Sequence, residues 1–198
     1  MKWRNLIACA MVFGGQIFSL GMLRANENSN PILKIESISF GGTGCPGGTV
    51  PWSYSAEDGL IELELNYMAQ TSEANLVDRK ACALAAPVTV ASGYQAGFRM
   101  KKMVYQAMIP VGGEGNIRTE IFFAGSRGPV YERTLGVGSY EGDLGSSEVI
   151  WGACGQQFNL RANTSVMVKS SEHHESAWAK LGPEVNFEIV FRRCGGGR

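Results

Sequence analysis

The two histidines of the chain stand side by side at His173 and His174, with Glu172 and Glu175 on either side. Imidazole and carboxylate groups bind metal ions, so this segment is a candidate metal site. Neighbouring residues of a strand point to opposite faces, however, and two histidines fall short of the three or four ligands of a typical zinc site. We therefore predict an exposed polar loop here, and assign no metal and no cofactor to the chain.

Three carboxylates gather in the glycine-containing stretch 140–148, at Glu141, Asp143 and Glu148. Oxygen ligands on a loop could hold calcium, but the spacing does not match the EF-hand pattern. We expect a flexible loop with solvated acidic side chains, and keep calcium binding as the alternative.

Aromatic side chains offer the best contact surface for a ligand. Trp52, Tyr54 and Trp178 are the candidate binding residues, because aromatic rings stack on sugars and anchor protein partners. The alternative is that they fill the core. For Trp151 we favour the core, since it lies three positions before Cys154 and could pack on a disulfide.

No catalytic residue stands out. The Gly-x-Ser-x-Gly turn that carries the serine nucleophile of many hydrolases is absent from the sequence. A hydrolase built from dispersed carboxylates stays open as an alternative, because spacing along the chain says nothing about such a pair.

Four cysteines, Cys45, Cys82, Cys154 and Cys194, remain when Cys9 is assigned to an N-terminal leader. An even number behind an export signal indicates two disulfides. Locality favours Cys45–Cys82 and Cys154–Cys194, but the chain-entropy model barely separates the three pairings, so the other two stay open.

The N-terminus has the pattern of a secretory signal peptide, with a basic start and a largely apolar run over 6–23. We assign 1–25 to this leader, 26–37 to a lead-in with the start of the first strand, and 38–198 to one β-sandwich domain. The alternatives are an uncleaved membrane anchor and lipoprotein processing at Cys9. We expect a secreted or extracellular protein, periplasmic in a bacterium, with no membrane span after leader removal.

The charge of the mature chain disfavours nucleic acid as a partner. Loss of Lys2, Arg4 and Arg24 leaves 15 basic residues against 18 acidic ones, a net charge of 15 − 18 = −3. Nucleic-acid binding depends on neutralising phosphates with lysine and arginine, and no basic stripe is present.

The segment 60–67 alternates apolar and polar residues, which is typical of a strand with one buried face. Its buried face would carry Ile61, Leu63, Leu65 and Tyr67, and its exposed face Glu62, Glu64 and Asn66. Further strands are expected at 33–40, 82–90, 98–109, 117–123, 148–151, 157–169 and 185–192.

Glycine-rich turns are expected at 112–115, 125–129 and 136–145, and one short helix at 175–181. The chain has 26 glycines among 198 residues, against a usual share of about 7%. Many short strands with glycine turns predict an all-β fold, a disulfide-stapled antiparallel β-sandwich of jelly-roll-like or Greek-key type.

Six short motifs occur in a recognisable order, and four of them contain a cysteine. They are 41–46, 79–82, 121–125, 151–155, 160–165 and 191–194. The chain resembles, from Ile38 to Cys194, the secreted proteins of the domain of unknown function family 4360. It departs from the family pattern at Ala81 and after Tyr105. The resemblance implies a secreted, disulfide-bonded, β-rich domain, and it supplies no catalytic residue.

These observations predict a secreted, non-enzymatic β-sandwich protein that binds an extracellular glycan, or a protein at the cell envelope. One alternative is a structural or protective extracellular protein without a specific ligand, and the other is the hydrolase with dispersed carboxylates.

Overall fold

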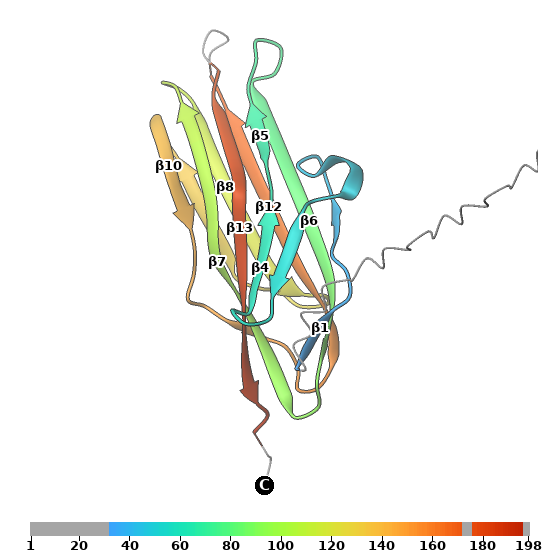
Figure 1. The fold of residues 1–198 in the computed structure, drawn as a ribbon. Coiled ribbons are helices and arrows are strands. Elements are labelled where there is room, and N and C mark those ends of the chain that lie inside the picture. Colours follow the sequence, from blue (N-terminus) through green and yellow to red (C-terminus); the bar gives the residue numbers. More distant parts are fainter. Residues whose placement is uncertain (1–31, 172–175, 196–198) are drawn as a thin grey trace, which may run out of the picture.

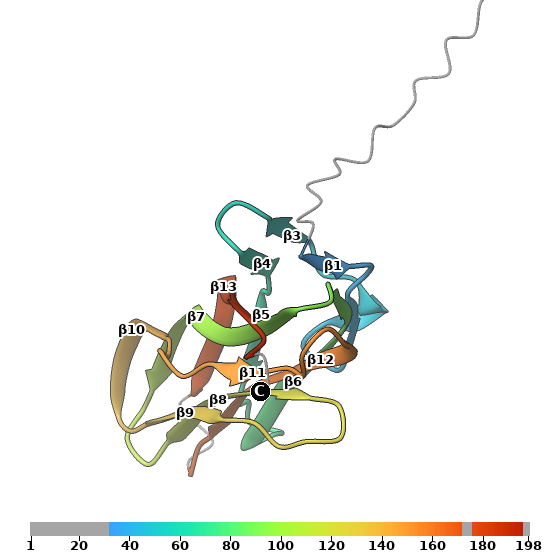
Figure 2. The ribbon, with the colours of Figure 1, turned by 90° about the horizontal axis from the view of Figure 1, so that it is seen from below.

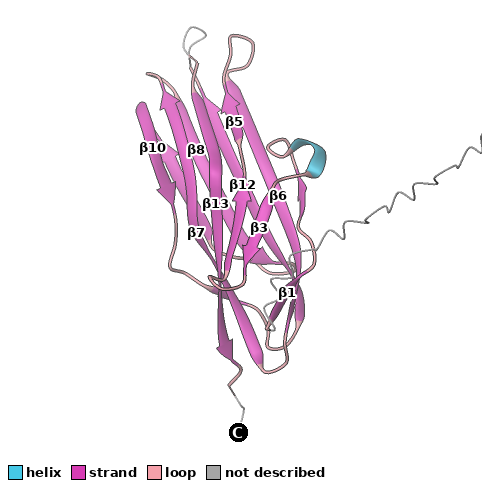
Figure 3. Ribbon diagram, in the orientation of Figure 1, coloured by secondary structure: helices cyan, strands magenta, loops and turns pink. Residues whose placement is uncertain are grey.

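The computed structural model describes residues 32–171 and 176–195, and the described chain folds into two antiparallel sheets packed face to face (Figures 1 and 3). One 3-10 turn, η1 (Pro46–Gly48), accompanies the strands. The prediction of an all-β, disulfide-bonded antiparallel sandwich is confirmed. The predicted leader and the pair His173 and His174 lie outside the described residues.

The first sheet, called here the β6 sheet, has the strand order β1-β6-β12-β8-β9, with β2 also paired to β6. Its strands are β1 (Leu33–Ile35), β2 (Ser39–Gly41), β6 (Val77–Val90), β8 (Glu114–Phe123), β9 (Val130–Leu135) and β12 (Gln157–Lys169).

The second sheet, the β13 sheet, has the order β10-β7-β13-β4-β3, with β11 paired to β7 and β5 to β13. In Figure 1 it faces the viewer, with β13 in its middle, and Figure 2 shows β10 and β3 at opposite edges. Its strands are β3 (Trp52–Ser55), β4 (Leu60–Glu64), β5 (Tyr67–Gln70), β7 (Tyr94–Ile109), β10 (Gly138–Leu144), β11 (Ile150–Trp151) and β13 (Trp178–Arg193).

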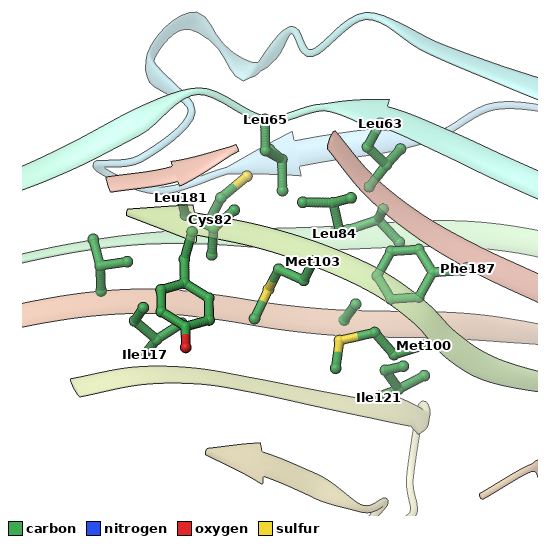
Figure 4. Packing of buried hydrophobic residues seen from close by; sticks show 14 of the residues in the cluster. Leu63, Leu65, Cys82, Leu84, Met100, Met103, Ile117, Ile121, Leu181 and Phe187 are labelled. Carbon is green, nitrogen blue, oxygen red and sulfur yellow. The ribbon is translucent and has the colours of Figure 1, made fainter. Parts of the chain in front are cut away.

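The core lies between the sheets and is built by alternate residues of both. Ile61, Leu63, Leu65 and Tyr67 are buried, as predicted, while the intervening residues are exposed. Figure 4 shows how side chains of the two sheets meet. The residues labelled there are Leu63, Leu65, Cys82, Leu84, Met100, Met103, Ile117, Ile121, Leu181 and Phe187.

The predicted helix at 175–181 is wrong over its described part. Trp178–Leu181 begins the long strand β13 and pairs with β5 on one side and β7 on the other. Ala177, Ala179 and Leu181 are fully buried, so the segment alternates in burial with period two. Strand partners on both sides override the helical tendency of a short alanine-containing segment, because a helix of this length needs tertiary support.

The predicted turn at 136–145 is also wrong, because most of it is the edge strand β10, paired with β7. Gly142 lies over Tyr105, where a Cβ atom would be 3.2 Å from the phenolic oxygen. Glycine allows close packing at this position. The many glycines of this segment therefore did not indicate a turn.

The interpretation of Trp151 as a core residue is wrong as well. Trp151 is only partly buried and lies over Gly97, where a Cβ atom would come within 2.9 Å of its ring. The guanidinium of Arg192 lies 3.9 Å from the ring centroid. Because Gly97 has no side chain, the Trp151 indole can pack directly against the backbone there. The Arg192 guanidinium packs against the indole ring.

The two disulfides are those that locality favours. Cys45–Cys82 has its Cα atoms 5.4 Å apart, and Cys154–Cys194 has them 6.0 Å apart. Cys45 and Cys82 are both buried, whereas Cys154 is exposed. The first disulfide is therefore part of the core, and the second joins the chain near its C-terminal end.

A hydrogen-bonded chain crosses the core beside the first disulfide. The Tyr67 hydroxyl donates to Thr164 Oγ1 at 2.7 Å, and Thr164 donates to the Cys82 carbonyl oxygen at 3.2 Å. Burial raises the pKa of Tyr67, while the hydrogen bond to Thr164 acts in the opposite direction.

Replacing Tyr67 with phenylalanine is expected to lower the free energy of unfolding near neutral pH by about 1–2 kcal/mol, because a buried hydrogen bond is lost. The stability that comes from keeping this phenol neutral is fully present below about pH 10, the ordinary tyrosine pKa, and is lost as the pH rises through and above it. Denaturant titrations of both proteins at neutral and alkaline pH should therefore show their stability difference shrinking in alkali. A difference that grows with pH would contradict this account.

Candidate functional site

A pocket of about 380 Å³ opens at the β3 side of the β13 sheet. Three strands contribute to it, namely β3, β4 and β13. The pocket is lined by Pro51, Trp52, Ser53, Glu62, Leu63, Glu64, Pro183, Glu184 and Asn186. We call this hollow the Trp52 pocket.

Strand pairing brings the polar side chains of the Trp52 pocket together. Ser53 pairs with Glu62, and Glu62 pairs with Asn186 on its other side. Glu184 pairs with Glu64 in the same ladder. Alternate residues of a strand share one face, so these side chains all project from the outer face of the β13 sheet.

An irregularity in β13 shapes the pocket wall. The register with β7 shifts between Leu181, opposite Tyr105, and Val185, opposite Met103. Gly182 within this bulge has φ +104°, and a Cβ atom there would overlap the carbonyl oxygen of Leu65. Only glycine allows this approach, which carries the chain into the pocket at Pro183 and Glu184.

Trp52 also lines the pocket, and 38% of its surface is exposed. It pairs with the buried Leu63, so its side chain leaves β3 on the opposite face from those of Ser53 and Glu62. Beside it, Ser53 Oγ donates a hydrogen bond to Glu62 Oε2 at 3.3 Å. The pocket therefore presents a carboxylate of β4 beside the edge strand β3, which carries the accessible Trp52.

Glu184 is held by two donors. Lys102 Nζ lies 2.8 Å from Glu184 Oε2, and Asn186 Nδ2 donates to Glu184 Oε1 at 2.8 Å. The hydrogen bond from Lys102 is the main cause that lowers the pKa of Glu184, and the same contact raises the pKa of Lys102. Glu184 is thus an anchored carboxylate, although the exposed ion pair itself adds little stability.

Asn186 is the most buried polar residue of the site, with 6% of its surface exposed. Its amide nitrogen faces Glu184, which leaves Oδ1 as the remaining acceptor. Within the described ranges no donor reaches this oxygen. A buried acceptor without a partner is uncommon in folded proteins, and this one belongs to a residue that lines a pocket.

Trp178 does not reach the Trp52 pocket. It lies on β13 between Met108 of β7 and Gln70 of β5, with buried neighbours on either side in the chain. Six residues of strand separate it from Glu184, which corresponds to about 20 Å. Tyr54 is half-buried and packs against the core. Of the three predicted binding residues, the structure places only Trp52 at the pocket.

The predicted acidic loop is divided between a strand and the loop after it. Glu141 and Asp143 are exposed residues of the edge strand β10, opposite Gln106 and Val104, and Glu148 follows beyond its end. In the part of the chain that the structure describes, no group of three or more histidine, cysteine or acidic side chains is placed to hold a metal ion.

Sequence reasoning missed Glu184 and Asn186 as site residues. The polar face with Glu62 and Glu64 could be read from local alternation, but its partners lie about 120 positions further along the chain. No local signal indicates which distant strand will pair with that face.

The fold and the pocket define a disulfide-bonded antiparallel β-sandwich with an aromatic, acidic pocket on one sheet. Residues 32–194 match the model of the domain of unknown function family DUF4360, and the chain belongs to this family. No curated protein matches the sequence.

Among solved structures, the chain is similar to TmCBM61, determined in complex with β-1,4-galactotriose. The TM-score is 0.30 at 12% sequence identity, over 79% of this chain and 90% of that one. Nowhere in the described residues is there a helix with the length and apolar character needed to cross a membrane.

Proposed function

We propose that this protein is a secreted, non-enzymatic glycan-binding domain and that the Trp52 pocket holds a sugar unit. The observation that carries the proposal is the gathering of the acceptors of Glu62, Glu64 and Asn186 in one pocket, with the accessible Trp52 on the edge strand that borders it. A pyranose ring has an apolar C–H face that stacks on an indole, and hydroxyl groups at its rim that donate hydrogen bonds to carboxylate and amide oxygens.

The electrostatics of the pocket support binding over hydrolysis. A glycosidase needs a carboxylic acid that stays protonated, which requires a raised pKa. The pKa of Glu184 is lowered instead, by its hydrogen bond from Lys102. Glu184 is thus suited to accept hydrogen bonds from a ligand and unsuited to donate a proton to a leaving group.

The disulfides support a location outside the cytoplasm. Stable structural disulfides persist in oxidising compartments and are rare in reducing ones. The leader-like segment at the N-terminus agrees with export. A glycan at the cell surface or in the extracellular matrix is the class of ligand such a protein meets.

Replacing Trp52 with alanine is expected to weaken glycan binding about 10- to 100-fold, because the stacking surface is removed. Affinity electrophoresis against soluble galactan, mannan, xylan, β-glucan and chitosan would first identify a bound polymer. Calorimetry with a disaccharide of that polymer would then give the dissociation constants, and thermal melting would confirm that the variant is folded.

Trp178→Ala is the matched control, because Trp178 lies on the outer face of the β13 sheet, too far from the pocket for a bound disaccharide to reach. We expect its affinity to equal that of the wild type. Retention of none of the five polymers, or unchanged affinity in Trp52→Ala, would refute the proposed function.

A further inference from the structure

The Trp52 pocket carries an excess of negative charge. Three carboxylates line it, those of Glu62, Glu64 and Glu184. Lys102, on the neighbouring strand, is paired with Glu184 at 2.8 Å. Among residues 32–171 and 176–195, no ion pair holds Glu62 or Glu64. Two negative charges therefore remain without a cationic partner in the pocket.

The hydrogen-bonding groups of the pocket are mainly acceptors. Glu62 and Glu64 accept only, and the free Oδ1 of Asn186 is a further acceptor. The hydroxyl of Ser53 already donates to Glu62. A complementary ligand therefore presents several donors, and a positively charged one gains most because charge-assisted hydrogen bonds are stronger than neutral ones.

The two carboxylates without a cationic partner favour a positively charged group on the ligand. An ammonium group would donate charge-assisted hydrogen bonds to them. An acidic sugar would instead bring a like charge beside Glu62 and Glu64.

We propose that the sugar unit held by the Trp52 pocket is an amino sugar with a free, protonated amine. This inference rests on the proposed function and narrows its ligand to a cationic glycan. An N-acetylated sugar has the same ring but no charge, so it forms weaker hydrogen bonds with the carboxylates.

Two probes test the inference directly, a β-1,4-linked glucosamine tetrasaccharide and its fully N-acetylated counterpart. They share one backbone and linkage and differ in the charged group. Calorimetry in weakly acidic buffer, where the amines are protonated, should give about tenfold or more tighter binding of the glucosamine form. Added salt should reduce that preference, because it screens the exposed charges.

Variants of the pocket should change the preference in both directions. Glu64→Gln removes one unpaired charge and should weaken binding of the glucosamine oligomer about threefold to tenfold, with little effect on the N-acetylated one. Lys102→Gln releases Glu184 from its ion pair and should strengthen binding of the glucosamine oligomer. Glu141→Gln, on β10 at the opposite edge of the sheet, makes the same charge change as Glu64→Gln and should leave the preference unaltered.

Equal affinity for the two oligomers, or equal losses in Glu64→Gln and Glu141→Gln, would overturn the amine inference alone. Binding of a neutral polymer that depends on Trp52, without binding of the glucosamine oligomer, would also overturn it and leave the proposed function intact. If none of these glycans binds, both proposals fail.

Discussion

Replacing Gly182 with alanine is expected to lower the free energy of unfolding by about 2–5 kcal/mol and to deform the Trp52 pocket. The backbone of Gly182 has φ +104°, which side-chain-bearing residues rarely adopt. A Cβ atom would also overlap the Leu65 carbonyl oxygen, a backbone atom that cannot rotate away. The strand must therefore shift, and Pro183 and Glu184 of the pocket must shift with it.

Gly93→Ala separates the cost of the backbone conformation from the cost of the steric overlap. Gly93 has φ +82° and nothing within 4 Å of its Cβ position. The control should lose only the conformational term, about 1–2 kcal/mol. Denaturant unfolding measures both losses, and ligand titration of Gly182→Ala reports on the pocket. A loss at Gly182 no larger than that at Gly93 would show that the close approach to Leu65 is unimportant.

Removing the Cys45–Cys82 disulfide by double alanine substitution should cost more than removing Cys154–Cys194. The sequence separations are 37 and 40, so the chain-entropy model assigns the two nearly the same value, about 4 kcal/mol each. Cys45 and Cys82 are also buried, at 3% and 2% exposure. Deleting their sulfur atoms leaves unfilled core volume, which adds about 1–2 kcal/mol.

A domain of this size has a total stability of about 5–15 kcal/mol. The Cys45→Ala, Cys82→Ala variant should therefore be close to unfolding, while the Cys154→Ala, Cys194→Ala variant remains folded. Guanidinium titrations of the two variants provide the comparison. The account would be wrong if the loss of Cys154–Cys194 proved equally or more damaging.

The regular pattern of the interior strand β12 made it predictable from sequence. The predicted strand 157–169 coincides with β12, which is paired on both sides along most of its length. The edge strands β3, β9 and β10 were not predicted, because they are largely exposed and show little apolar alternation. Such segments become strands through their neighbours, and that information lies elsewhere in the chain.

Local sequence determined the features that depend on consecutive residues. These are the sandwich class, the outward-facing carboxylates of Glu62 and Glu64, and the cysteines available for two disulfides. Trp52 and Trp178 were equal candidates at that level. Only the tertiary structure separated them, by pairing β4 with β13 so that Glu184 and Asn186 line the same pocket as Trp52. The physical reason is that strand register depends on hydrogen bonds and burial between distant segments, so a site made across strands has no local pattern.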